Sequence, residues 1–331
     1  MIWSLVTGGT GTIGSRLVLR LLKAKKRVRI FSRDEGKQVE LEERLLRAGF
    51  PKERFRMFIG DVRDSDRLTR AMQGVSEVFH AAALKHVVSC EYNPSEAVET
   101  NIKGIQNLVK AASAAGVKSV VNMSSDKAAE PNNLMGATKL VGERIITQAN
   151  AYGGGCRFMS LRFGNVMGSR GSVLPRWTES AKSEGLIRIT NPRMTRFVMS
   201  IDEAVDLTLR ASEEGAGGEI FIKDMLAVQL GVLAETWVKR WESFYNGKLK
   251  TIEIGSREGE TLHEQLITTE EVHRTIMCNG FFVITPNIIF KSVNYDHYVP
   301  DMCLADAYSS GGAKMLDAAE IRELLPAWEK P

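Results

Sequence analysis

The feature that most constrains the fold is a set of three glycines between a strand pattern and a helix pattern at the start of the chain. Residues 2–6 form a short apolar run, and Gly8, Gly11 and Gly14 follow it at intervals of three. The helix pattern is carried by apolar residues at spacings of three and four: Leu17, Val18, Leu21 and Leu22. In such a turn the first glycine permits a tight bend, the second lets a phosphate approach the backbone, and the third lets the helix pack closely. Because the N–H groups at a helix start favour anions, the segment predicts a dinucleotide-binding turn.

Strand and helix patterns then alternate along the first half of the chain. Strand patterns occupy residues 27–32, 55–59, 75–80, 119–123 and 157–163, and helix patterns occupy residues 40–46, 97–115 and 133–152. This alternation predicts right-handed βαβ crossovers, and therefore a Rossmann-type α/β fold with a doubly wound parallel sheet.

The regular alternation decays after about residue 166, where helix patterns near 202–211 and 228–245 stand among short strands. We therefore expect residues 1–166 to form the dinucleotide-binding domain. Residues 167–331 would form a smaller α/β domain that binds the substrate and is partly interleaved with the first.

Composition narrows the class of protein. The net charge of +4 is small for 331 residues and argues against nucleic acid as a partner. No apolar run approaches the roughly 18 residues of a membrane span, so we expect a cytoplasmic protein without a membrane partner. The four cysteines are scattered without metal-ligand spacing, which predicts buried free thiols and no metal site: Cys90, Cys156, Cys278 and Cys303.

The residues after the second strand bear on the choice between NADP and NAD. Arg33 and Lys37 are suited to clamp a ribose 2′-phosphate, to which Ser32 can donate, so NADP is favoured. In the alternative, these charges are a solvated loop and Asp34 faces the ribose of NAD. Other residues expected to contact the cofactor lie in the glycine turn or follow the third and fourth strands: Thr7, Thr12, Ile13, Asp61, Val62, Ala81, Ala82 and Ala83.

Several motifs resemble a known family along nearly the whole chain, from Leu5 to about Leu325. The stretch from Ala81 to Val87 and the Thr100-Asn-Ile-Lys-Gly segment resemble the extended short-chain dehydrogenase/reductases. Further motifs resemble the UDP-N-acetylglucosamine 4,6-dehydratases within that superfamily: Ser124-Ser-Asp-Lys-Ala, Asn133-Leu-Met-Gly-Ala-Thr-Lys, Arg162-Phe-Gly-Asn-Val-Met-Gly-Ser-Arg-Gly-Ser-Val, Arg193-Met-Thr-Arg-Phe and Arg257-Glu-Gly-Glu-Thr-Leu-His-Glu.

The resemblance implies a lyase that oxidises its sugar at C4, eliminates water across C5 and C6, and returns the hydride to C6. NADP would be tightly bound and recycled, and the product would enter surface-glycan or glycoconjugate biosynthesis. The Phe31-Ser-Arg-Asp-Glu segment is similar to the branch that inverts C5 and gives the L-arabino ketosugar. The alternatives are a C5-retaining dehydratase, a UDP-sugar 4-epimerase, or a non-catalytic NADP-binding regulator.

By the same resemblance, Asp126 is the acid for the 6-hydroxyl, Lys127 the base at C5, and Ser125 a hydrogen-bond partner of the C4 oxygen. Asp126 must hold a proton near neutral pH, and Lys127 must be able to lose one. Burial pushes both groups in those directions, whereas the attraction between their charged forms opposes it. The alternative is a turn or helix cap followed by an exposed lysine.

Met135 stands where the superfamily has a tyrosine, four residues before Lys139, which by resemblance binds the nicotinamide ribose. A thioether cannot accept the proton of the C4 hydroxyl. The base for that step therefore stays open among Lys127, Asp126, water relayed through Ser125 and, at greater distance, Lys85.

Candidate substrate residues are spread more widely. Asn165 is expected to read a phosphate or uracil edge, Arg196 and Arg257 to clamp the pyrophosphate, and Glu260 to accept from the uridine ribose. Lys85 and Asn101 are expected to touch the sugar or to order the catalytic loop. For each arginine the alternative is a surface salt bridge. Helix patterns at 97–115 and 133–152 suggest a homo-oligomer, either a dimer or a hexamer.

Overall fold

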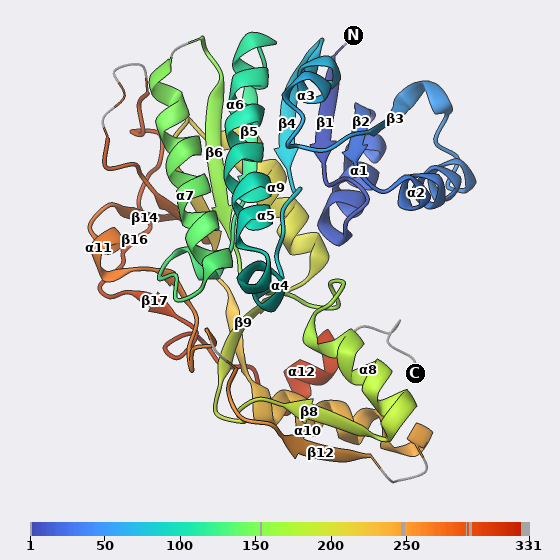
Figure 1. Ribbon diagram of the computed structural model, residues 1–331. Helices are drawn as coiled ribbons and strands as arrows, with labels where there is room; N and C mark the ends of the chain where they lie inside the picture. The colour runs from blue at the N-terminus through green and yellow to red at the C-terminus, as the bar shows by residue number, and fades with distance from the viewer. Residues whose placement is uncertain are drawn as a thin grey trace.

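The computed structural model describes residues 2–152, 154–245, 249–257, 259–288, 290 and 293–325, apart from the side chains of residues 302 and 303. Its centre is a large sheet with the strand order β16-β14-β15-β10-β6-β5-β4-β1-β2-β3 (Figure 1). The parallel part contains β3 (Phe55–Ile59), β2 (Arg27–Ser32), β1 (Trp3–Thr7), β4 (Val75–His80), β5 (Ser119–Met123), β6 (Arg157–Arg162) and β10 (Ile220–Lys223). This is the 3-2-1-4-5-6 order of a doubly wound dinucleotide-binding sheet, so the predicted fold class is confirmed.

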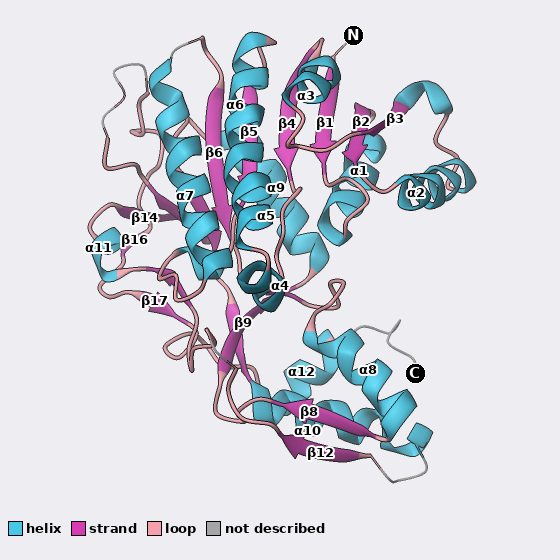
Figure 2. Ribbon diagram, viewed as in Figure 1, coloured by secondary structure: helices cyan, strands magenta, loops and turns pink. Residues whose placement is uncertain are grey.

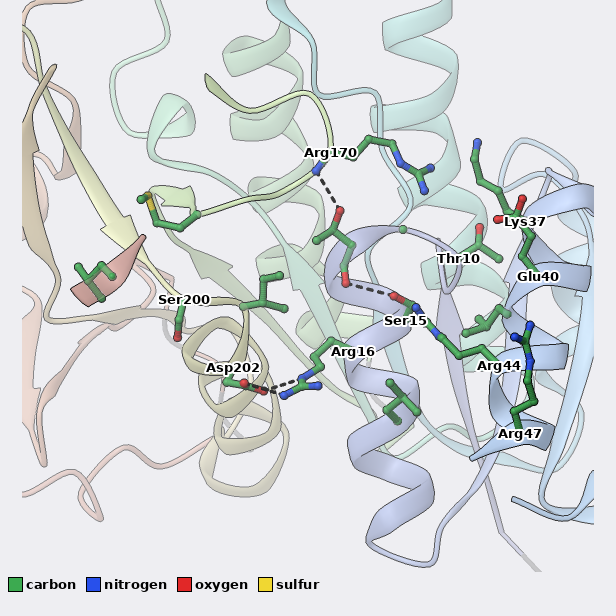
Figure 3. A pocket seen from close by; sticks show the side chains of 17 residues that line it. Thr10, Ser15, Arg16, Lys37, Glu40, Arg44, Arg47, Arg170, Ser200 and Asp202 are labelled. Carbon is green, nitrogen blue, oxygen red and sulfur yellow. Dashed lines mark hydrogen bonds and ion pairs between the residues drawn. The ribbon is translucent and has the colours of Figure 1, made fainter. Parts of the chain in front are cut away.

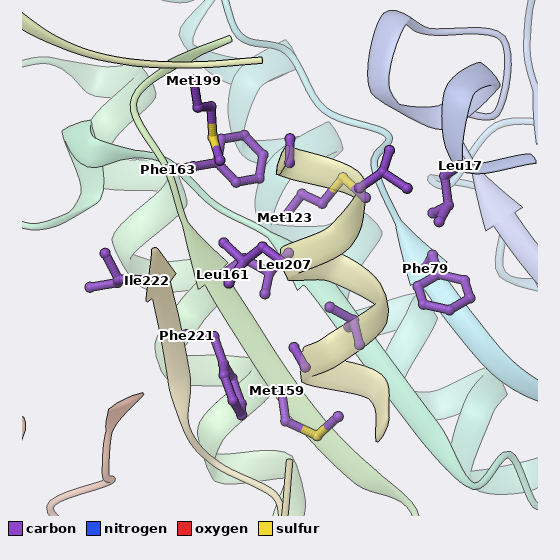
Figure 4. Close-up of a cluster of buried hydrophobic side chains, with 14 of the residues drawn as sticks. Leu17, Phe79, Met123, Met159, Leu161, Phe163, Met199, Leu207, Phe221 and Ile222 are labelled. Atoms are coloured by element: carbon purple, nitrogen blue, oxygen red, sulfur yellow. The ribbon is translucent and has the colours of Figure 1, made fainter. Parts of the chain in front are cut away.

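Helices cover both faces of the sheet (Figure 2). One face carries α1 (Thr12–Lys23) and α9 (Ile201–Glu214), and the other carries α3 (Ser65–Met72), α6 (Gly104–Ala114) and α7 (Leu134–Ala149), while α2 (Glu35–Arg47) packs beside β3. The core beneath α9 is apolar: Leu207 packs with Met159, Leu161 and Phe221 of the sheet (Figure 4). The two helices α1 and α9 are also joined by a bidentate ion pair between Arg16 and Asp202.

The chain returns to the sheet late in the sequence. Beyond β10, the antiparallel strands β15 (Phe281–Ile284), β14 (Thr275–Cys278) and β16 (Met302–Cys303) extend it. The expected boundary at residues 166 and 167 falls directly after β7 (Asn165–Val166). Beyond it, however, β10 and these three strands belong to the large sheet, and α9 packs on that sheet. The second half of the chain is therefore divided between the large sheet and a smaller unit.

The remainder of the second half forms a smaller unit below the sheet in Figure 1. It contains α8 (Val173–Glu184), β8 (Leu186–Ile189), α10 (Leu230–Trp241), β12 (Lys250–Glu253) and α12 (Ala318–Leu324). Trp177 and Trp237 pack edge to face at its centre, with ring centroids 6.0 Å apart. Short sheets connect the two units: β7 with β9 (Thr195–Met199) and β11 (Leu226–Gln229), and β13 (Gln265–Ile267) with β17 (Tyr308–Ser309).

Two helix predictions need correction. The expected helix 97–115 is three segments: α5 (Pro94–Val98), a π-helical turn (Glu99–Lys103) and α6. The π turn surrounds Asn101, whose side chain is bonded to the backbone of Leu84. The expected helix 228–245 starts too early, because residues 228 and 229 pair with β9 as part of β11, and it ends in a 3₁₀ turn at Glu242–Tyr245. Short helices α4 (Val87–Tyr92) and α11 (Thr269–Val272) complete the described α-helices.

Cys90, Cys156 and Cys278 are buried free thiols, as expected, whereas the side chain of Cys303 lies outside the described part. None of the described helices is long and apolar enough to cross a bilayer.

Candidate functional site

The glycine turn brings stretches of backbone into close contact: Gly8 lies against Ala81 and Ala82, and Gly14 of α1 lies against Gly8. Gly8 has a φ of +64°, and a Cβ there would lie 2.7 Å from the backbone of Ala81 and Ala82. A Cβ on Gly14 would lie 2.3 Å from the carbonyl oxygen of Gly8. Helix α1 begins after Gly11, which offers no side chain to cap its free N–H groups. The turn therefore fits a pyrophosphate, because it presents unoccupied donors where no side chain can intrude.

A cavity of about 240 Å³ lies beside this turn at the carboxyl ends of the strands. Most of the residues expected to contact a cofactor line it: Gly8, Gly11, Ser32, Arg33, Asp34, Lys37, Asp61, Val62, Ala81, Ala82 and Ala83. The lining also includes Thr100 and Arg170, which the sequence did not single out. The hydroxyl of Thr100 is buried and has no hydrogen-bond partner in the described part, so it is open to a ligand.

Three further turn residues lie around the cavity rather than in its lining. The hydroxyl of Thr7 is buried against the Nδ1 atom of His80 at 2.7 Å, and burial lowers the pKa of this histidine to about 3. Ile13 packs against the core at the start of α1. Thr12 accepts a hydrogen bond from the backbone N–H of Arg170 at 3.1 Å, which attaches the loop after β7 to the helix start.

Charged groups at the cavity are arranged in pairs. Asp34 caps α2 by accepting from the N–H of Lys37, whose ammonium also contacts the same carboxylate. Asp61 accepts two hydrogen bonds from the guanidinium of Arg63, at 3.0 and 2.7 Å, and a longer one from Arg33 at 3.4 Å. Burial alone would raise the pKa of Asp61, but Arg63 outweighs it and the pKa is lowered. The side chain of Arg33 is 53% exposed, so its guanidinium remains accessible to a phosphate.

A cluster of ionisable side chains stands at the end of β5, in a 3₁₀ turn (Asp126–Ala128). The Oδ1 atom of Asp126 accepts from the hydroxyl of Ser125 at 2.6 Å and lies 3.3 Å from the Nζ atom of Lys127. Asp126 is only 4% exposed, and its Oδ2 atom has no hydrogen-bond partner among the described residues. Ser125 also caps the turn, so the structural role that the sequence left open is present in the structure.

Glu264 is a member of this cluster that the sequence interpretation missed. Its Oε1 atom lies 3.2 Å from the Nζ atom of Lys127 and 3.3 Å from the Nε atom of Arg196. Burial, followed by the charge of Asp126, raises the pKa of Glu264. The only signal was its position at the end of the Arg257-Glu-Gly-Glu-Thr-Leu-His-Glu motif, 137 residues from Lys127.

At Lys127, burial and attraction to the nearby carboxyl groups have opposite effects on the pKa, and attraction has the larger effect. Burial alone would lower its pKa, but Asp126 and Glu264 outweigh burial and the pKa is raised. Lys127 is therefore an ammonium ion held between the carboxyl groups of Asp126 and Glu264, and it must release a proton before it can accept one.

Met135 and Lys139 lie on α7. Met135 is buried against Cys90 and Ala97, where a packing role is evident. Lys139 donates from Nζ to the carbonyl oxygen of Met123 at 2.8 Å, at the end of β5. Burial lowers the pKa of Lys139 to about 8, so this amine is far easier to deprotonate than Lys127.

The structure places the expected substrate residues in different surroundings. Lys85 donates to the backbone carbonyl of Arg170 at 2.7 Å, and burial lowers its pKa. Asn101 is only 1% exposed, and its amide is occupied by the backbone of Leu84 and by Thr138. Of the two expectations for Asn101, these hydrogen bonds favour ordering of the loop, and both stay predictions.

The other expected substrate residues lie toward the second half of the chain. Asn165 donates to the carbonyl of Phe197 at 3.2 Å, and Arg196 joins the cluster of Asp126 and Lys127 through Glu264. Arg257 and Glu260 hydrogen-bond to one another, on a loop whose Gly259 carbonyl accepts from Asn133 just before α7.

The comparisons with known proteins agree with this architecture. A family model described as "polysaccharide biosynthesis protein" matches residues 4–286. An uncharacterized membrane protein of Methanocaldococcus jannaschii is 44% identical, covering 97% of this chain and 94% of that protein. A UDP-glucose 4-epimerase of Rickettsia bellii is 39% identical, with coverage of 97% and 94%.

Solved structures resemble the chain as well. The X-ray structure of Pen from Bacillus thuringiensis is 39% identical, has a TM-score of 0.87, and covers 98% of this chain and 96% of its own. DesIV from Streptomyces venezuelae, a dTDP-glucose 4,6-dehydratase solved with NAD, is 23% identical with a TM-score of 0.69, covering 79% and 87%, and shows the fold alone. On the family model and the relatives above 30% identity, this chain belongs to the polysaccharide biosynthesis protein family.

Proposed function

We propose that the chain is a nucleotide-sugar 4,6-dehydratase that converts UDP-N-acetylglucosamine to a 4-keto-6-deoxy sugar with a tightly bound NADP. The observation that carries the proposal is the buried cluster of Asp126, Lys127 and Glu264 at the carboxyl end of β5. Ligands of doubly wound folds bind at this edge of the sheet.

The elimination breaks the C5–H bond and the C6–O bond and releases water. A nicotinamide dinucleotide in the groove would take the hydride from C4 and return it to C6. In its protonated form Asp126 is positioned as the acid, because its Oδ1 atom is held by Ser125 and Lys127 while its buried Oδ2 atom is left to carry the proton to the departing hydroxyl, and Asp126 becomes a carboxylate in that step.

Lys127 is proposed to take the C5 proton after passing its own proton to a neighbouring carboxylate. Glu264 is suited to receive that proton, because its pKa is raised by burial and it lies 3.2 Å from the lysine Nζ atom. The base for the C4 hydroxyl stays open among Lys127, Asp126, a water relayed through Ser125, and Lys85.

The cofactor assignment rests on Arg33, Lys37 and Ser32, which line the cavity after β2. DesIV and other proteins of the same fold are solved with NAD, so NAD is the alternative. Lys139 is proposed to bind the nicotinamide ribose. We further propose that Asn165, Arg196, Arg257, Glu260 and Lys85 hold the UDP-sugar, and that the product has an inverted C5. The homo-oligomer and the cytoplasmic location stay predictions.

A UDP-sugar 4-epimerase is the second candidate, favoured by the Rickettsia bellii relative named for that activity. An epimerase returns the hydride to C4 and needs no acid for a C6 hydroxyl. The acid role proposed for the buried carboxyl of Asp126 has no counterpart in that reaction, so the dehydratase is favoured.

The test is incubation of the purified protein with UDP-N-acetylglucosamine, followed by mass spectrometry. A dehydratase gives a product lighter by one water, and an epimerase gives a product of unchanged mass. NMR of the ketosugar then distinguishes the L-arabino product of C5 inversion from the D-xylo product of retention.

A further inference from the structure

The loop between β7 and α8 places an additional arginine, Arg170, at the proposed cofactor groove. It lines the 240 Å³ cavity and also a larger cavity of about 890 Å³ between α1, α2 and the start of α9 (Figure 3). Gly168 and Gly171 on either side have φ angles of +66° and +74°, so the loop adopts a bend that other side chains disfavour.

The backbone of Arg170 is bonded on both sides of the groove. Its N–H donates to the hydroxyl of Thr12 at the start of α1, at 3.1 Å. Its carbonyl oxygen accepts from the ammonium of Lys85 at 2.7 Å. One residue thus connects the cofactor helix to a lysine that is proposed to face the sugar.

The side chain of Arg170 extends across the glycine turn that carries Thr10 and points toward Lys37 (Figure 3). Lys37 has the largest effect in lowering the pKa of Asp34, and the positive charge of Arg170 adds to it, so the guanidinium stands near the end of β2. Within the described residues Arg33 and Lys37 have carboxylate partners, whereas no ion pair or hydrogen bond engages the guanidinium of Arg170.

We propose that Arg170 recognises the 2′-phosphate of the adenosine ribose and closes its loop over the cofactor. The inference rests on the proposed NADP enzyme. The pyrophosphate already has the free N–H groups of α1, whereas the end of β2 is where such folds read the ribose. Because the carbonyl of Arg170 holds Lys85, cofactor binding would also order that lysine on the sugar side.

The test measures binding of 2′,5′-ADP and of 5′-ADP by titration calorimetry, so that no turnover is needed. Arg170→Ala is expected to weaken 2′,5′-ADP by about 10- to 100-fold, the range for a hydrogen bond to a charged group, and 5′-ADP by less than about 3-fold. Arg170→Lys should recover part of the affinity, because lysine keeps the positive charge but cannot donate the two parallel hydrogen bonds of a guanidinium.

The matched control is Arg47→Ala, which removes an arginine that lines only the larger cavity and pairs with Glu43. It should leave both affinities unchanged. If Arg170→Ala weakens both affinities equally, or weakens neither, the inference about Arg170 is overturned while the NADP assignment stands. If the wild-type protein does not prefer 2′,5′-ADP, both the NADP assignment and the inference fail.

Discussion

Two buried ionic networks in this molecule look alike in composition and differ in how completely their atoms are satisfied. In the first, Arg162 of β6 is fully buried, and each of its guanidinium nitrogens donates to Glu143, Glu271 or the backbone of Leu266. In the second, Asp126, Lys127 and Glu264 meet at the end of β5, and one carboxylate oxygen of Asp126 has no partner in the described part.

This difference in hydrogen bonding is the one we expect between a network that only supports the fold and a network that takes part in chemistry. The Arg162 network ties α7, β6 and α11 together and leaves no atom for a ligand. The Asp126 network leaves a buried oxygen unsatisfied and an ammonium that is partly accessible, and both carry a desolvation cost. A fold retains such a cost where a ligand uses it, so the second network is the one we expect to react.

The largest effect is expected from Lys127→Ala. Loss of the proposed base should reduce kcat by about 10³-fold, within the range for general acid–base catalysis. Product formation is measured by mass spectrometry and folding by circular dichroism. The control is Lys26→Ala, which removes a lysine paired with Glu77 away from the cluster. Full activity in Lys127→Ala would break the distinction between the two networks.

Arg162→Ala should act on stability instead. It leaves Glu143 and Glu271 buried without a cation, which costs about 3–5 kcal/mol of unfolding free energy, measured by denaturant titration. A triple variant with Glu143→Leu, Arg162→Met and Glu271→Leu should regain much of that loss, because no charge is then left buried. If Arg162→Ala retains wild-type stability, the structural role of this network is wrong.

Glu264→Gln is expected to change the pH dependence of the reaction. Glu264 helps to raise the pKa of Lys127, so removing its charge should lower that pKa and shift the ascending limb of the kcat/KM profile to lower pH. The rate at the optimum should fall by about 10-fold. Glu271→Gln is the matched control in the other network, and it should leave the limb in place. An unshifted limb in Glu264→Gln would place this residue outside the proton pathway.

The lowered pKa of Lys139 predicts a smaller effect, an increase of folding stability with pH. Burial lowers its pKa from 10.5 to about 8, so the unfolded chain binds this proton more tightly than the folded one. The folded state is penalised below about pH 8, and the penalty is relieved as pH rises from 8 toward 10.5. Relative to Lys139→Met, nucleotide-free wild-type protein should gain on the order of 2 kcal/mol between about pH 7 and pH 9.5. A constant difference would contradict the lowered pKa.

The smallest effect is expected from Met135→Leu. Met135 is buried and cannot accept a proton, so a volume-conserving change should cost less than about 1.5 kcal/mol of stability and alter kcat only a few-fold. Thermal unfolding and initial rates measure the two. A collapse of activity in a folded Met135→Leu protein would return this position to the chemistry.

The sequence could predict those elements whose pattern is complete within a short segment. Strand β2 begins with alternating polar and apolar residues, β3 and β5 are mostly apolar, and the bounds of all three were predicted to the residue. The glycine turn is equally local. The antiparallel strands β14 to β16 were not predicted, since they take their place from pairing with β10 and with one another.

Candidate site residues divide in the same way, into those that a local motif identifies and those that only long-range contacts bring together. Ser125, Asp126 and Lys127 are adjacent and could be found from their motif. Glu264 is brought to Lys127 from another part of the chain, and no local pattern contains that contact. Asn101 shows the converse: its motif drew attention to it as a substrate or loop-ordering residue, but only the structure shows that its side-chain amide is hydrogen-bonded to the backbone of Leu84.

The central claim is that the Asp126 network eliminates water from a nucleotide sugar, and incubation in deuterated water tests it most directly. Breaking the C5–H bond and returning a solvent proton must leave deuterium at C5 of a product that has lost one water. We expect UDP-N-acetylglucosamine to give that product, detected by NMR and mass spectrometry, with no added NADPH consumed. A product of unchanged mass with no deuterium at C5, formed by the wild-type protein, would contradict the claim and support the epimerase.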